Sequence, residues 1–172
     1  MIRRLTVLSA VAVLGACASM SSPTVPSQLQ APAGEKLASM ASAKGVQIYR
    51  CTPAAAGKNE WRYVNPEATL FDKGGAEIGS HSGSPNGPVW TAKDGSTVTG
   101  RMKASSDAPG YAIPWLLLER QAASGSGVYS NVTSIQRVNT TGGRPPEGAC
   151  SDNQKDLTIR VNYTADYYYY TK

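Results

Sequence analysis

The alternation of apolar and polar residues is clearest toward the C-terminal end of the chain. Apolar side chains occupy every second position from residue 157 to residue 165: Leu157, Ile159, Val161, Tyr163 and Ala165. The residues between them are polar, and a period of two over nine residues predicts a β-strand with one buried face.

Two short aspartate-containing turns separate further strand candidates. Asp94-Gly95 lies between residues 88–92 and 97–102, and Asp72 with the glycines that follow it lies between 60–71 and 76–81. Glycine tolerates the positive φ of a tight hairpin turn, so each pair of flanking segments is expected to pair antiparallel. Three more segments have strand character, and Gly-, Ser- and Pro-rich loops separate them: 45–51, 114–120 and 130–138.

Residues 35–44 carry the one helical pattern in this chain. Leu37, Met40, Ala41 and Lys44 follow the spacing i, i+3, i+4 and i+7, and Gly45 is a plausible stop. The small residues of this segment fit a strand equally well, and both interpretations stay open. With seven to nine short strands and no connection long enough for a crossover helix, we predict an all-β fold with little helix, an antiparallel sandwich or barrel built as a meander.

The first residues predict an export signal. Two arginines precede a 12-residue apolar run, too short to span a bilayer, which ends in Leu14-Gly15-Ala16-Cys17. That ending resembles the bacterial lipoprotein box. The resemblance implies cleavage before Cys17 and acylation of Cys17 with palmitate-type chains, which anchor the protein to a membrane. A plain secretory signal with a chance cysteine, or an uncleaved anchor, is the alternative.

This interpretation divides the chain into a signal peptide (1–16), a lipidated cysteine with a flexible Pro- and Ser-rich tether (17–33) and a single β-rich domain (34–172). Ala18, which follows the cysteine, favours the outer membrane and a periplasm-facing location in the bacterial cell envelope.

The remaining cysteines are Cys51 and Cys150. An even pair in an exported domain predicts a disulfide, because the cell envelope is oxidising. Two free thiols are the alternative. A bridge closing a loop of about 100 residues is worth about 4.7 kcal/mol in the chain-entropy model, which suits a chain with one phenylalanine and few large aliphatic residues.

Charge and histidine content exclude several functions. The net charge is +5, but the basic residues are dispersed, so nucleic acid is not an expected partner. With His81 as the single histidine and two cysteines expected to be bridged, no zinc site can be assembled, and no cofactor-binding loop is present. We therefore predict neither a metal nor a cofactor.

A few aromatic residues are candidates for a ligand site. His81 lies among glycines and serines, which suggests an exposed strand end, where ligand sites often lie; a hydrogen-bonded structural histidine at a turn is the favoured interpretation and a ligand role the other. In the run 167–170, alternation sends Tyr168 and Tyr170 to the face opposite their neighbours, where an exposed pair would form a stacking platform. The candidate ligand site therefore comprises His81, Trp90, Tyr168 and Tyr170.

Eight short runs of the chain are similar to the domain-of-unknown-function 3455 family: 45–51 (GVQIYRC), Trp61 with 66–68 (PEA), 78–81 (IGSH), 87–90 (GPVW), 94–100 (DGSTVTG), 113–117 (IPWLL), 135–137 (IQR) and 163–167 (YTADY). They occur in matching order. The resemblance implies a β-rich secreted domain and carries no established activity. The five residues between His81 and Gly87 exceed the family's usual spacing.

The sequence thus predicts a non-catalytic envelope domain with a binding or structural role, whose partner is a small apolar or glycan ligand or an envelope protein. The alternative is an envelope hydrolase that uses His81 with a carboxylate remote in sequence. No nucleophile–base pair appears at a recognisable spacing, so whether the chain is an enzyme stays open.

Overall fold

The computed structural model describes residues 20–55 and 57–172. Eight strands account for most of them: β1 (Lys36–Pro53), β2 (Asn59–Phe71), β3 (Glu77–Ser84), β4 (Gly87–Ala92), β5 (Thr97–Ser106), β6 (Trp115–Ser124), β7 (Val132–Gly142) and β8 (Thr158–Thr171). Two 3₁₀ turns, η1 (Ser27–Leu29) and η2 (Asp152–Gln154), complete the elements. None of the helices in this part of the chain is long and apolar enough to cross a membrane.

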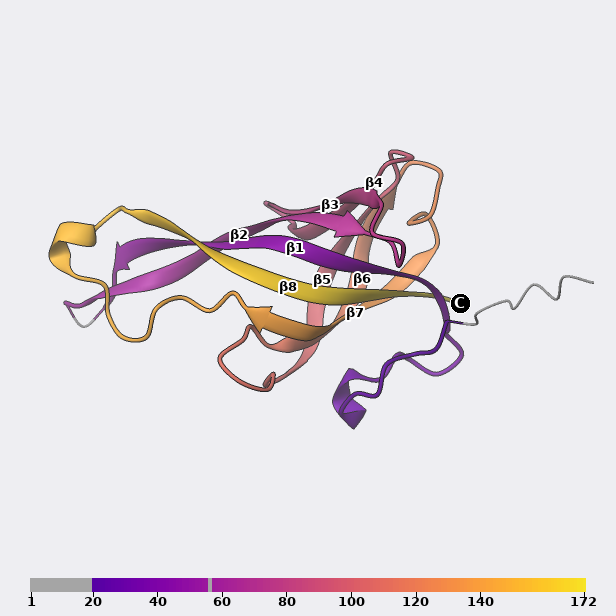
Figure 1. The fold of residues 1–172 in the computed structure, drawn as a ribbon, viewed down its shortest axis with the longest axis horizontal. Helices are drawn as coiled ribbons and strands as arrows, with labels where there is room; N and C mark the ends of the chain where they lie inside the picture. The colour runs from indigo at the N-terminus through magenta and orange to yellow at the C-terminus, as the bar shows by residue number, and fades with distance from the viewer. Residues whose placement is uncertain (1–19, 56) are drawn as a thin grey trace, which may run out of the picture.

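The strands form one closed barrel. Each strand pairs antiparallel with the next, and β8 pairs with β1 to close the sheet (Figure 1). The predicted all-β meander is confirmed, and of the two architectures left open the protein adopts the barrel. Closure leaves no free edge among the eight strands.

The predicted hairpin turns are present. Gly95 has a φ of +84°, and Asp94 Oδ1 accepts hydrogen bonds from Ser96 N (2.8 Å) and Ser96 Oγ (2.6 Å). Asp72 Oδ1 accepts from Gly74 N and Ala76 N in the same manner. The aspartate therefore satisfies the backbone donors of the turn, and glycine takes the conformation that other residues avoid.

The helical pattern in residues 35–44 is misleading, because this segment belongs to β1. A bulge lies between Leu37 and Ser39, where β1 pairs with Tyr170 and Tyr169 of β8. The extra residue places Leu37 and Met40 on the same face of the strand although they are three positions apart. That spacing imitates a helix.

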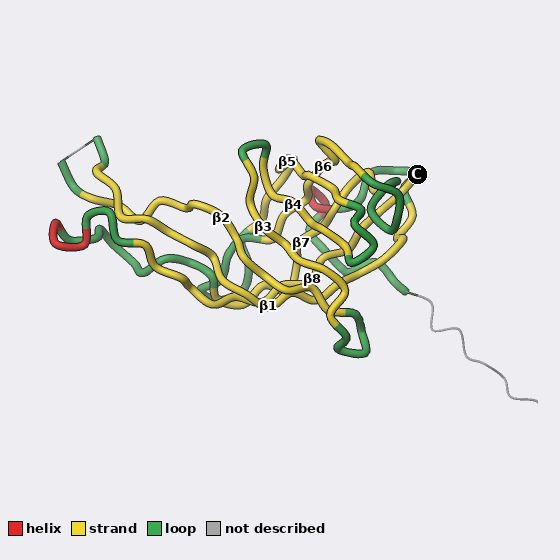
Figure 2. The backbone as a smooth tube through the Cα atoms, turned by 90° about the horizontal axis from the view of Figure 1, so that it is seen from above, coloured by secondary structure: helices red, strands yellow, loops and turns green. Residues whose placement is uncertain are grey.

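An arm projects from one end of the barrel. It consists of the ends of β1, β2 and β8 and the connection from β7 to β8 (residues 49–63 and 143–160), and Figure 2 shows η2 at its tip. The predicted disulfide is present here: Cys51 on β1 is bonded to Cys150, with Cα atoms 6.1 Å apart. Asn59 and Cys150 also form an isolated antiparallel bridge. The disulfide thus joins the two stretches of chain that form the arm.

The hydrophobic core lies inside the barrel. Aromatic residues supply much of its bulk, with Trp90, Tyr129, Tyr163, Tyr167 and Tyr169 all nearly inaccessible to solvent. They compensate for the few large aliphatic residues in the sequence.

A second buried layer lies outside the barrel. Leu29, in η1, is fully buried, and η1 lies beside β5 and β6. Gln136, on the outer face of β7, donates from Nε2 to Leu29 O at 2.6 Å and accepts from Tyr170 Oη at 2.7 Å. Ser134 Oγ donates to the Glu35 carboxylate. At Leu29 the chain therefore lies against the barrel, whereas the boundary between tether and domain at residue 33 stays a prediction. The predicted signal peptide and Cys17 lie outside the described residues.

Candidate binding cavity

A cavity of about 440 Å³ occupies the arm end of the barrel interior. All eight strands contribute to its lining, together with the loop that joins β5 and β6 (residues 107–114, hereafter the strap). The lining is mainly apolar and aromatic, and the described residues that form it include no aspartate or glutamate. Its size falls in the range of roughly 300–1,000 Å³ that is typical of small-molecule sites.

Three aromatic side chains form the buried part of this lining. The rings of His81 and Trp90 are stacked, with centroids 4.4 Å apart and planes 14° from parallel. The Tyr167 ring meets both edge-on, at 5.1 Å from His81 and 5.3 Å from Trp90. Gly100 makes room for this cluster, since a Cβ there would lie 3.0 Å from Trp90 Cζ3. The three rings present an apolar, polarisable surface to the cavity.

The glycines and serines beside His81 suggest an exposed strand end, but the structure places His81 in the interior. It is 3% exposed, because its strand partners are Ala68 and Trp90 and its side chain faces the interior. The pKa of His81 is lowered to about 3, chiefly by burial; the hydrogen bond to Val89 O opposes this shift, and the charge of Arg137 adds to it. His81 is therefore neutral at neutral pH. Its Nδ1 lies 2.9 Å from Val89 O, a distance that assigns the proton to Nδ1 as donor.

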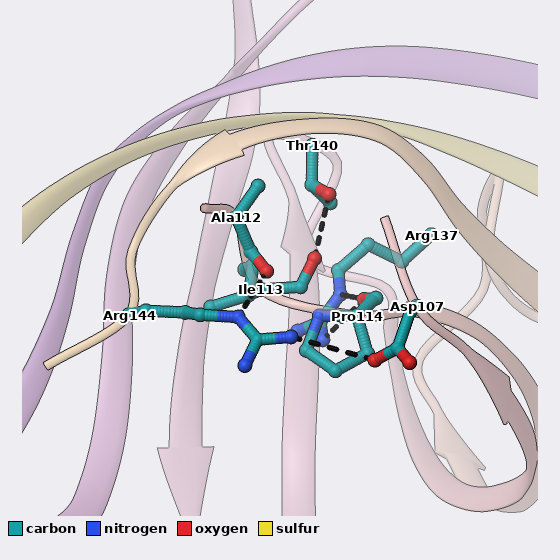
Figure 3. Close-up of polar contacts among 7 residues, drawn as sticks. All are labelled: Asp107, Ala112, Ile113, Pro114, Arg137, Thr140 and Arg144. Atoms are coloured by element: carbon teal, nitrogen blue, oxygen red, sulfur yellow. Dashed lines mark hydrogen bonds and ion pairs between the residues drawn. The ribbon is translucent and has the colours of Figure 1, made fainter. Parts of the chain in front are cut away.

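Among the described residues that line the cavity, Arg137 is the one that carries a positive charge. It follows Ile135 on the inward face of β7, in register with Leu116 and Tyr167. Its Nε and Nη2 donate to Pro114 O of the strap at 3.1 and 2.8 Å (Figure 3). Among the described residues it forms no ion pair.

The strap is attached to β7 and the residues after it by several hydrogen bonds. Thr140 Oγ1 donates to Ile113 O at 2.6 Å, and Arg144 Nε donates to Ala112 O at 2.6 Å (Figure 3). Ile113 N donates to Gly142 O at 2.9 Å. These bonds hold Ile113 and Pro114 in place as part of the cavity wall.

Large apolar side chains surround the entrance. Tyr63, Val64 and Met102 line the cavity and are 54%, 47% and 61% exposed. Grouped exposed apolar residues of this kind mark binding surfaces more often than isolated ones do.

A comparison with protein families is decisive at this point. The family described as protein of unknown function (DUF3455) matches residues 32–171, which include all eight strands and the whole cavity lining. The chain belongs to the DUF3455 family. No curated protein matches the chain, and no solved structure matches it.

The resemblance to the DUF3455 family is thus confirmed, and the five residues between His81 and Gly87 can be placed in the structure. They are the last three residues of β3 and the two-residue turn to β4, where Ser84 Oγ donates to Gly87 O at 2.9 Å. Ser84 and Gly87 both line the cavity. This end of the β3–β4 hairpin therefore contributes to the cavity wall.

The four residues of the predicted ligand site do not come together. His81 and Trp90 line the cavity, whereas Tyr168 and Tyr170 lie on the outer face of β8. Tyr170 is 2% exposed next to Gln136 in the outer layer, so the pair forms no open platform. The predicted alternation of the tyrosines is correct, but the tyrosine of this run that lines the cavity is Tyr167, on the inner face of β8.

Sequence reasoning missed two of the lining residues that matter most, Arg137 and Tyr167. The signal for Arg137 was its spacing of two from Ile135, which puts a charge on the apolar face of a strand. For metals, the described residues hold no group of three or more suitable ligands.

Proposed function

We propose that this DUF3455 protein is a non-catalytic binding protein that holds a small, mainly apolar molecule inside its barrel. The observation that carries the proposal is the cavity itself: about 440 Å³, lined by every strand, and surrounded at its entrance by exposed apolar side chains. An enclosed apolar site with a few polar groups is the usual form of a small-molecule binding site.

An apolar ligand fits the site better than a glycan. Sugars stack on accessible aromatic faces and need many hydrogen-bond partners. The tyrosines that would serve as an accessible platform are Tyr168 and Tyr170, of which Tyr170 is buried. The aromatic rings of the cavity are instead enclosed among apolar neighbours such as Leu118 and Ile113.

Nothing in the cavity favours the hydrolase alternative. A histidine acting as general base works best with a pKa near the operating pH, whereas the pKa of His81 is lowered to about 3. The carboxylate that such a mechanism needs is not among the described lining residues.

The proposed setting is the bacterial cell envelope. The lipoprotein-like sequence ending in Cys17 supports a membrane anchor, and the Cys51–Cys150 bridge suits an oxidising compartment. Mass spectrometry of the protein from its native membranes tests the anchor. We expect cleavage before Cys17 and a mass increase from acyl chains; an intact signal or an unmodified Cys17 contradicts this setting.

Binding can be tested with N-phenyl-1-naphthylamine, a neutral apolar probe whose fluorescence rises in an apolar site. We expect saturable binding of one probe per barrel. The variant Ser105→Trp, which adds bulk at a lining position, should reduce binding at least tenfold. Ser106→Trp is the matched control, because adjacent strand residues point to opposite faces and Ser106 does not line the cavity. Absence of probe binding, or equal binding by both variants, would overturn the proposal.

A further inference from the structure

We infer that the ligand is an acidic amphiphile, whose carboxylate or phosphate head group is bound by Arg137 and whose apolar part lies against Trp90 and Tyr167. This inference rests on the proposed function and specifies the class of ligand.

The first support is the uncompensated charge of Arg137. Its guanidinium has five N–H donors, and two of its nitrogens donate to the single neutral acceptor Pro114 O. Two arginines near the arm are paired with acids: Arg144 contacts Asp107 at 3.5 Å, and Arg160 contacts Glu67 at 2.5 Å. A partly buried charge is costly without a counter-charge. Because the described lining offers none, an anion from outside would supply it.

The second support is the position of this charge within the site. Arg137 acts electrostatically on groups from three other strands: it lowers the pKa of His81 on β3 and opposes the burial-driven rise in pKa of Tyr49 on β1 and Tyr167 on β8. The charge of the Arg137 guanidinium thus affects ionisable groups on several sides of the cavity. The other ionisable side chains of the lining are tyrosines and neutral His81, so the interior carries one net positive charge.

The remaining lining suits the apolar part of the same molecule. The stacked His81–Trp90 pair and Tyr167 form one wall, and the exposed Val64 and Met102 extend the apolar surface to the entrance. Arginine binds carboxylate and phosphate through two parallel hydrogen bonds, which gives such a site selectivity for the acid over a neutral analogue.

The test is displacement of bound N-phenyl-1-naphthylamine by three compounds with the same alkyl chain: dodecanoate, dodecyl phosphate and 1-dodecanol. We expect at least one of the two acids to displace the probe at a concentration about tenfold or more below that of the alcohol, since a charge-assisted hydrogen bond contributes a factor of that size. Comparison of the two acids identifies the head group.

Variants assign the preference to Arg137. In Arg137→Gln the two acids should displace the probe only at the concentration that dodecanol needs, and the concentration needed for dodecanol should not change. Arg137→Lys should restore part of the difference in displacing concentration between the acids and the alcohol. Arg144→Gln is the matched control, because Arg144 also donates to a strap carbonyl but does not line the cavity. It should keep the full preference for the acid.

The outcomes separate the inference from the proposed function. Equal displacement by acids and alcohol in the unmodified protein, or an acid preference that persists in Arg137→Gln, overturns the inference and leaves apolar binding intact. Failure of the probe to bind the unmodified protein contradicts both.

Discussion

Replacement of His81 by phenylalanine gives a quantitative test of the buried aromatic cluster. His81 is the one histidine of the chain, and its pKa is lowered to about 3 in the folded state, chiefly by burial. In the unfolded chain its pKa is about 6.5. Between these values the unfolded state binds a proton that the folded state rejects, so the stability of the fold decreases as the pH falls from about 6.5 toward 3.

The expected magnitude follows from the two pKa values. From pH 7 to pH 5, this single group should lower the free energy of unfolding by about 2 kcal/mol. In His81→Phe the ring can still stack on Trp90, but no proton is taken up, so this pH-dependent loss disappears. The variant is expected to be less stable than the unmodified protein at pH 7, because Val89 O loses its hydrogen bond.

The assay is urea unfolding of both proteins at pH 7 and at pH 5. The difference between their pH-dependent losses isolates His81, since the carboxylates titrate equally in both proteins. We expect the unmodified protein to lose about 2 kcal/mol more than His81→Phe. Equal losses in the two proteins would refute the argument and indicate that His81 is accessible to protons in the folded barrel.

Two further predictions concern the arm and the outer layer. Replacing Cys51 and Cys150 together by alanine should lower the free energy of unfolding by about 2–5 kcal/mol; urea unfolding under non-reducing conditions measures this, and a loss below about 1 kcal/mol would show that the bridge does not restrict the unfolded chain. Leu29→Ala should cost about 2–5 kcal/mol, because the side chain is fully buried outside the barrel. The exposed Met20 provides the control, since Met20→Ala should change the stability by less than about 0.5 kcal/mol. If both variants have the same stability in thermal unfolding, residues 27–33 do not pack against the barrel.

The strands were predictable because their signals are local. Alternation in residues 157–165 and the Asp-Gly turns report the pleat and the hairpin geometry directly. The disulfide was predictable because two cysteines remain in a domain that is expected to be exported to an oxidising compartment. In residues 35–44 the sequence leaves helix and strand open, because a bulge shifts the alternation by one residue and small residues such as Ala41 and Ala43 do not distinguish a strand from a helix.

The candidate site was only half predictable, because its arrangement depends on contacts between distant segments. His81 looked exposed among glycines and serines, but its register with Trp90 turns it inward. Tyr168 and Tyr170 were correctly assigned to one face, yet alternation does not say which face lies inside the barrel. Closure of β8 on β1 and the burial of Leu29 outside decide that question.

The most direct test of the central claim is a nuclear magnetic resonance titration that follows the indole N–H signals of the tryptophans. Trp90 lines the cavity, whereas Trp61 lies in the arm and does not. On addition of N-phenyl-1-naphthylamine, we predict that the Trp90 Nε1–H resonance moves in a saturable manner while that of Trp61 stays in place. A Trp90 resonance that does not move while the probe binds would place the ligand outside the barrel and contradict the account.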